Sequence, residues 1–171
     1  MNRPTVPPEP GGGVPSEGDR PPTPDDLLDF EGLLTRWLAT QLVENPAVTA
    51  AERDPERGTR RWLVRVEGEA KPTFTVWFEI RQRSLHAETH LAPAPMEPPA
   101  AAQEYLLRSI RRFRGVSAWI GGEDAFYVGV DVPVGNVDEV ALDHLLGSLY
   151  EATEAMFVTL MRLGFGDRFK G

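Results

Sequence analysis

Two histidines and a glutamate alternate along a short stretch of the chain, at His86, Glu88 and His90. Imidazole and carboxylate groups are ligands that zinc and iron accept. If this stretch is a strand, the three side chains share one face, with successive ones about 7 Å apart. A metal holds its ligands at about 2 Å, so a neighbouring strand would have to supply a partner. We favour a polar row facing solvent and keep a metal site as the alternative.

Four arginines give residues 99–114 a basic side, at Arg108, Arg111, Arg112 and Arg114. A nucleic-acid site would add exposed aromatic side chains and a basic domain, and this sequence has a formal net charge of −8. Glu104 lies four residues before Arg108, the spacing of an intrahelical ion pair. We therefore expect a solvated face or a contact with a protein partner, in which Arg108 and Arg111 are the candidates.

No other motif predicts catalysis. Gly121 and Gly122 lack the lysine of a phosphate-binding loop, and a hairpin turn that needs residues with positive φ explains them. Ser148 lacks the glycines of a nucleophile elbow, and His144 lies too near it on the same predicted helix for a triad. The sequence has no cysteine, which excludes disulfides, thiolate metal sites and cysteine nucleophiles. We expect no enzyme activity and no cofactor.

Composition sets further limits on partners. Of 171 residues, 41% are hydrophobic and 26% charged, which is ordinary for a globular domain. The charge of −8 argues against nucleic acid and an anionic membrane surface as partners. No apolar run approaches the roughly 20 residues of a membrane span, and the absence of cysteine fits a reducing cytoplasm. The excess of arginine over lysine, with many alanines and prolines, is typical of a GC-rich, actinobacterial-type genome.

The hydrophobic pattern predicts one α+β domain over residues 23–165. It follows a disordered, Pro/Gly-rich tail over 1–22 and precedes a short tail over 166–171. Helical spacing of apolar residues predicts helices, and alternation predicts strands. The expected elements are a helix over 23–45 capped by Thr23, strands over 47–52, 62–66, 74–80 and 84–91, a helix over 99–114, a hairpin of 116–120 with 125–132, and a helix over 136–163 that Asn136 caps and Gly164 ends. This α-ββββ-α-ββ-α order is typical of an antiparallel sheet with helices packed on it.

Leu63 and Trp77 fall on the sheet face opposite the main apolar rows of their strands. Either the sheet is covered on both of its faces, or this face is exposed for a partner. Exposed apolar patches usually mark interaction surfaces, so Leu63 and Trp77 are our candidate partner-binding residues.

The region from Tyr105 to Met156 resembles the YbjN-like, type III secretion chaperone-like proteins of bacteria. The matching features are Tyr105-Leu106-Leu107-Arg108, Phe113-Arg114-Gly115, the strand Phe126 to Val132 before Pro133, and Leu142, Leu145, Leu146 and Leu149 of an acidic helix. The element order extends the resemblance over about 23–163. Members often carry an asparagine in the helix that corresponds to 105–114, and this sequence has none there.

The resemblance implies a non-enzymatic, often homodimeric domain that holds a segment of a client protein on apolar surface. We therefore predict a cytoplasmic protein-interaction module, chaperone-like or a regulatory adaptor. The alternatives are a metal-binding protein or metal-dependent enzyme using His86, Glu88 and His90, and a binder of small ligands or nucleic acid using the arginines of 108–114.

Overall fold

The computed structural model describes residues 21–56 and 58–170. The tail predicted over 1–22 therefore lies almost entirely outside the described residues. In the described part of the chain three α-helices accompany one six-stranded sheet of strand order β1-β2-β3-β4-β6-β5, in which every neighbouring pair is antiparallel. The elements are α1 (Pro24–Glu44), β1 (Val48–Arg53), β2 (Arg61–Glu67), β3 (Thr73–Ile80), β4 (Ser84–Ala92), α2 (Ala100–Ile110), β5 (Ser117–Ile120), β6 (Phe126–Pro133) and α3 (Glu139–Phe165). The predicted α+β class and element order are confirmed.

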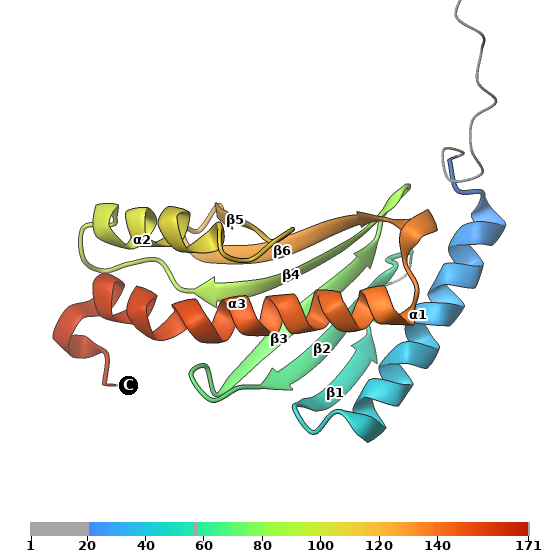
Figure 1. Cartoon of the computed structure of the whole chain (residues 1–171), viewed down its shortest axis with the longest axis horizontal. Helices are drawn as coiled ribbons and strands as arrows, with labels where there is room; N and C mark the ends of the chain where they lie inside the picture. Colours follow the sequence, from blue (N-terminus) through green and yellow to red (C-terminus); the bar gives the residue numbers. More distant parts are fainter. Residues whose placement is uncertain (1–20, 57, 171) are drawn as a thin grey trace, which may run out of the picture.

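All three helices lie on one side of the sheet (Figure 1). The helix α3 crosses the strands, α1 lies against β1, and α2 lies beside α3. Alternate residues of the strands point toward this helix layer and are buried, as Val64 on β2 and Val76 and Phe78 on β3 illustrate. The strand period of two therefore separates a core side of the sheet from a second side.

The core side of α3 is a continuous apolar stripe, which burial against the sheet stabilises by about 25 cal/mol per Å² of apolar surface. Its buried hydrophobic residues are Leu142, Leu145, Leu146, Leu149, Ala152, Met156 and Leu160. From α1, Leu34 and Trp37 extend the same core, and Trp37 makes an edge contact with Phe78 at 5.7 Å between ring centroids. The spacing of apolar residues predicted both stripes.

Helix ends show where the sequence prediction was right and wrong. Thr23 and Asp26 form a reciprocal capping box at the start of α1, as Thr23 predicted. At the start of α3 the predicted cap Asn136 is wrong, because Asn136 lies in a short 3-10 turn and Asp138 accepts the bond from the Ala141 amide at 2.8 Å instead.

Two predictions about glycines also need correction. Gly166, at φ 52°, ends α3 in place of Gly164. Gly164 is buried, and its carbonyl accepts the amides of Met96 and Glu97, which hold the connector before α2 against α3. In the β5–β6 turn the left-handed residue is Asp124, at φ 62°, rather than either of the paired glycines.

The helix α2 is shorter than predicted. It ends at Ile110, and residues 111–115 form turns that lead through Gly115, at φ 78°, into β5. Arg111, Arg112 and Arg114 therefore lie beyond the helix on which the sequence placed them.

Glu154 joins α3 to the turn between β2 and β3. Its carboxylate accepts the backbone amides of Glu69, Ala70 and Lys71 at 2.8, 2.7 and 3.0 Å. Gly68 makes this approach possible, because a Cβ there would lie 2.3 Å from a Glu154 carboxylate oxygen. One side chain thus satisfies three turn amides and fixes where α3 crosses the sheet.

We predict that Glu154→Ala lowers the free energy of unfolding by about 2 kcal/mol, because hydrogen bonds to a charged group each contribute about 1.5–3 kcal/mol and water replaces part of them. Urea denaturation measures the change. Glu151→Ala, which removes an exposed carboxylate three residues earlier on α3, is the control. Equal stability of the two variants would show that the turn does not depend on Glu154.

Candidate functional site

The second side of the sheet carries no helix (Figure 1). We call it the open face and define it by the side chains that alternate with the core positions of β2, β3, β4, β6 and β5. Its central row follows the strand register through Leu63, Trp77, Glu88, Gly129 and Ser117. Antiparallel pairing places directly opposite residues about 5 Å apart, so this row crosses five strands side by side.

Leu63 and Trp77 lie together on this face, as the sequence predicted. They are directly opposite each other on β2 and β3, and both are half-buried. No helix of the described chain covers Trp77, but the guanidinium of Arg61 lies 4.1 Å from its ring centroid. Asp54 is 3.8 Å from the Nε of Arg61. The apolar patch is therefore small and bordered by charge.

The predicted row of His86, Glu88 and His90 does share the open face, opposite buried Leu85, Ala87 and Leu91. His86 is nevertheless buried and not solvent-facing. Its Nε2 lies 3.1 Å from Glu88 and its Nδ1 lies 3.0 Å from Asp131 of β6. His90 instead contacts the edge of Tyr127, with ring centroids 5.4 Å apart.

This arrangement gives the metal alternative no support. Within residues 21–56 and 58–170, no group of three or more His, Cys, Asp or Glu side chains is placed to hold a metal ion. The two histidines point to different partners, and the imidazole of His86 already lies between two carboxylates.

Trp119 and Tyr127 form an aromatic pair that the sequence prediction missed. They are opposite each other on β5 and β6, and their rings are stacked 5.9 Å apart at an interplanar angle of 11°. The Trp119 ring lies over Gly129, where a Cβ would be 2.7 Å from the indole. The alternation of Tyr127 with buried Phe126 and Val128 was the signal that could have placed one of them on this face.

Carboxylates surround this aromatic pair. The Tyr127 hydroxyl donates to Glu123, which raises the pKa of Tyr127 to about 12 and lowers the pKa of Glu123. The phenol is therefore neutral at physiological pH. Glu88 and Asp131 lie on the other side, on either flank of His86.

Lys71 is a buried cation at one end of the sheet. Its ammonium donates to the carbonyls of His90 and Leu91 and lies 5.4 Å from the ring centroid of Phe157. Burial lowers the pKa of Lys71 to about 8. Burial of the imidazole, followed by the nearby Lys71 charge, also lowers the pKa of His90.

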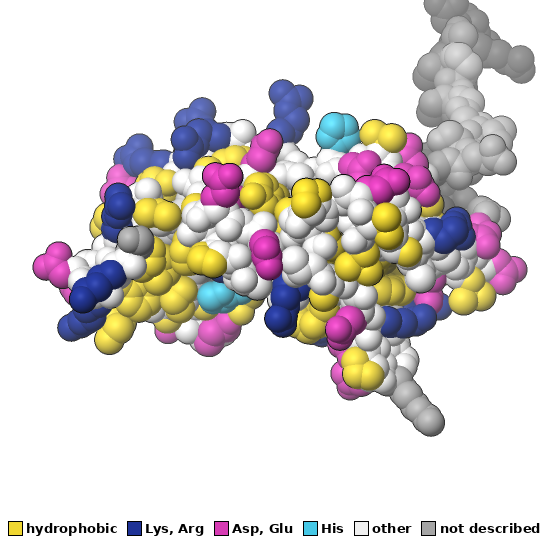
Figure 2. All heavy atoms as spheres, turned by 90° about the horizontal axis from the view of Figure 1, so that it is seen from below, with side chains coloured by type: hydrophobic (Ala, Val, Ile, Leu, Met, Phe, Trp, Pro, Cys, Tyr) yellow, Lys and Arg dark blue, Asp and Glu magenta, His cyan; other side chains and the backbone are white. Residues whose placement is uncertain are grey.

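The structure does not bring Arg108 and Arg111 to the open face. Both are exposed, Arg108 on α2 and Arg111 at its end, and α2 belongs to the helix layer. Arg108 forms the predicted pair with Glu104 at 2.7 Å. Figure 2 shows Lys and Arg side chains grouped over the end of the molecule that carries α2. The predicted partner-binding residues thus occupy two separate surfaces.

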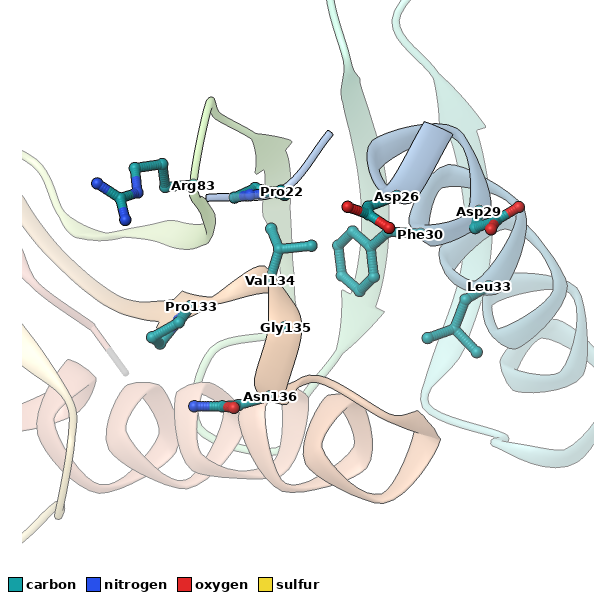
Figure 3. Close-up of a pocket in the computed structure, with 10 residues that line it drawn as sticks. All are labelled: Pro22, Asp26, Asp29, Phe30, Leu33, Arg83, Pro133, Val134, Gly135 and Asn136. Atoms are coloured by element: carbon teal, nitrogen blue, oxygen red, sulfur yellow. The ribbon is translucent and has the colours of Figure 1, made fainter. Parts of the chain in front are cut away.

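Two cavities lie on the helix side of the molecule. One of about 550 Å³ separates the start of α1 from the β6–α3 connection, where Phe30 and Val134 lie next to each other and Arg83 points away (Figure 3). Asp26 at its wall is engaged in the α1 cap. A second cavity of about 500 Å³ lies between the end of α1 and α3, with Val48 and Leu146 in its wall. Neither gathers a set of catalytic side chains.

Comparison with known sequences finds distant relatives among uncharacterized mycobacterial proteins. No model of a known protein family matches the chain. An uncharacterized protein of Mycobacterium leprae is 30% identical over 108 residues, which are 63% of this chain and 59% of that protein. An uncharacterized protein of Mycobacterium tuberculosis is 26% identical over 103 residues, which are 60% of this chain and 56% of that protein. The chain thus spans less than two thirds of the length of these relatives, and its YbjN-like resemblance stays a prediction.

Comparison with solved structures identifies the fold. A chain of the HopA1–SchA chaperone–effector complex superposes with a TM-score of 0.54, covering 80% of this chain and 99% of that one at 14% identity. The type III secretion chaperone SycH of Yersinia pestis, in complex with a fragment of YscM2, gives a TM-score of 0.48 over 74% of this chain and 98% of that one at 16% identity. The fold is type III secretion chaperone-like. None of the helices in the described residues is both long and apolar enough to span a membrane.

The Lys71 environment predicts a pH dependence of stability. The pKa of Lys71 is about 8 in the folded chain, against 10.5 for a lysine side chain in water, so the unfolded chain binds more protons between these values. The free energy of unfolding should therefore rise with pH from 8 to 9.5, by up to about 1.4 kcal/mol per pH unit. Below pH 8 both states carry the proton and the dependence disappears.

Urea denaturation at pH 8 and 9.5 measures this rise. Lys71→Met should abolish it, whereas Lys170→Met, which removes an exposed lysine, should keep it. If the free energy of unfolding of Lys71→Met still rises between pH 8 and 9.5, the group that releases the proton is not Lys71.

Proposed function

We propose that this chain is a non-enzymatic, chaperone-like protein-binding module that holds a segment of a partner protein on its open face. The observation that carries the proposal is a sheet with its helices on one side and Leu63, Trp77, Trp119 and Tyr127 on the other. Large aromatic side chains supply much of the contact energy at protein interfaces. Their presence on the side that lacks helices favours a binding surface over a second core.

The charges on the open face favour binding over catalysis. His86 lies between Glu88 and Asp131, and Tyr127 donates to Glu123. These groups hold one another in place, and no nucleophile paired with a base accompanies them within the described ranges. The likeness to a chain of a chaperone–effector complex supports the same role. The cysteine-free composition favours the cytoplasm, and the net negative charge favours protein over nucleic acid.

We predict that Trp77→Glu or Leu63→Glu reduces recovery of a partner at least tenfold, because a charge on this face cannot be desolvated against an apolar side chain. Tagged protein recovers partners from a lysate of the organism that produces it, and quantitative mass spectrometry measures them. Val140→Glu is the matched control, since Val140 is an exposed apolar residue at the start of α3, in the helix layer.

The contact itself is located by placing a photo-crosslinking residue at position 77 and identifying the partner peptide attached to it. Partners recovered equally by wild type and Trp77→Glu would refute the open face as their binding site.

We further infer that two copies pair through β5. This strand is an edge of the sheet and its last residue, Ile120, is exposed. Unpaired edges are templates for another strand. Arg112 and Arg114 precede β5, and Glu123 and Asp124 follow it. Antiparallel pairing of two β5 strands about a twofold axis sets the basic start of each against the acidic end of the other. The helix α2 contacts β5, and its residue Leu107 is 70% exposed.

Light scattering tests the homodimer. The Gly121 amide donates to the Ala125 carbonyl, so Gly121 directs its backbone groups toward β6. Every second residue of an antiparallel strand does so, and the N–H and C=O groups of Ala118 and Ile120 therefore point away from β6. Ala118→Pro removes an outward amide, and Leu107→Glu introduces like charge across the axis, so each should shift the wild-type dimer to a monomer at micromolar concentration. Val140→Glu should remain dimeric. A monomeric wild-type chain would refute the pairing.

A further inference from the structure

We propose that Trp119 and Tyr127 form a subsite for a positively charged side chain, arginine or lysine, of the partner segment. This inference rests on the proposed function and names the chemistry of the partner. The stacked rings lie on the open face. Aromatic faces attract cations through their quadrupole, and the attraction grows when both groups are desolvated.

The protein itself provides an example of this recognition on the same face. The Arg61 guanidinium lies 4.1 Å from the ring centroid of Trp77, and the Asp54 carboxylate lies 3.8 Å from its Nε. Indole and carboxylate together hold that guanidinium. Trp77 therefore offers its remaining surface, with Leu63, to apolar side chains.

Trp119 has the same two components without the cation. Glu88, Asp131 and Glu123 lie around the aromatic pair. Within residues 21–56 and 58–170, no arginine or lysine lies over either ring. The imidazole of His86 lies between Glu88 and Asp131, and the guanidinium of Arg81 is 3.6 Å from Asp131 and 2.9 Å from Glu79. The negative charge at this subsite is thus only partly balanced by the chain itself.

The glycine beneath Trp119 lets the indole approach the β6 backbone, because a Cβ at position 129 would lie 2.7 Å from the ring. Tyr127 is stacked beside the indole and the His86 ring lies 6.0 Å from it at a tilt of 44°, so the cation is placed on the part of the indole that these two rings leave exposed. The ring stays half-buried, so a cation placed on it is partly shielded from water. The neutral Tyr127 hydroxyl, held by Glu123, fixes the neighbouring ring in the stack.

The strand register sets the spacing of the two partner side chains. In the central row, β4 lies between Trp77 on β3 and Gly129 on β6. Two strand-to-strand spacings therefore separate these residues, which is about 10 Å. A segment in the polyproline II conformation covers this distance in three residues, because it rises about 3.1 Å per residue and returns to the same side every third residue. The segment should therefore carry an apolar residue and, about three positions away, a cationic one.

The test uses a short capped peptide with a leucine and, three positions later, an arginine, in a serine background. Its control carries citrulline, which keeps the shape of arginine and removes the charge. Binding is followed by NMR through the indole N–H signals of the four tryptophans, assigned by substitution. We expect the arginine peptide to shift the Trp119 signal and to bind at least fivefold more tightly than the citrulline peptide.

Variants of the protein, including one matched pair of charge changes, separate the subsite from general attraction to an acidic protein. Trp119→Leu and Glu88→Gln should each weaken the arginine peptide at least fivefold. Glu151→Gln, the same change in charge on an exposed site of α3, should alter binding less than twofold. Equal loss in Glu88→Gln and Glu151→Gln, or equal binding of both peptides, overturns the subsite.

Failure of the subsite is distinguishable from failure of the function. If partner capture depends on Trp77 but tolerates Trp119→Leu, the open face binds protein and the cation site is wrong. If capture tolerates Trp77→Glu as well, the proposed function fails. A wild-type protein that does not bind the arginine peptide at millimolar concentration, at low salt, also overturns the subsite.

Discussion

The position of α3 over the sheet decides which side of this molecule is available to others. Its apolar stripe packs on the core side, and Glu154 fixes it by accepting three amides of the β2–β3 turn. Because α3 is fixed both by its apolar stripe and by the Glu154 contact, it covers the core side of the sheet and no part of the open face. With α1 and α2 in the same layer (Figure 1), the second side receives no element of the described chain.

A sheet face without a covering layer must remain compatible with water. On the open face, charged groups lie beside the aromatic rings. Arg61 lies over Trp77, Glu88 and Asp131 flank His86, and Glu123 accepts the hydrogen bond of the Tyr127 hydroxyl. Each aromatic ring is partly buried by a neighbour on its own face. The surface keeps large side chains for contact without forming the broad apolar patch that promotes aggregation.

Alternation within single strands predicted both sides of β2 and β3, and so placed Leu63 and Trp77 on the same face of the sheet; their direct pairing came only with the register. The Trp119–Tyr127 pair could not be predicted in the same way, because it depends on β6 inserting beside β4 and leaving β5 at the edge. That order is set by long-range pairing, which local periodicity does not contain. The cap of α3 was misplaced for a related reason: Asn136 and Asp138 are equally good capping residues, and the 3-10 turn at 134–136 decides between them.

The two proposed surfaces reinforce each other. A twofold axis perpendicular to the sheet keeps the open faces of both copies on the same side, so β5 pairing would extend one face into the other. Trp119 lies on β5 itself, and its subsite would then stand beside the axis, next to that of the second copy. A partner with two cationic side chains would engage both at once, and linked binding gains affinity from effective concentration. Pairing of the edge strands would therefore do more than protect an edge: it would bring together the two proposed subsites, one at the margin of each monomer.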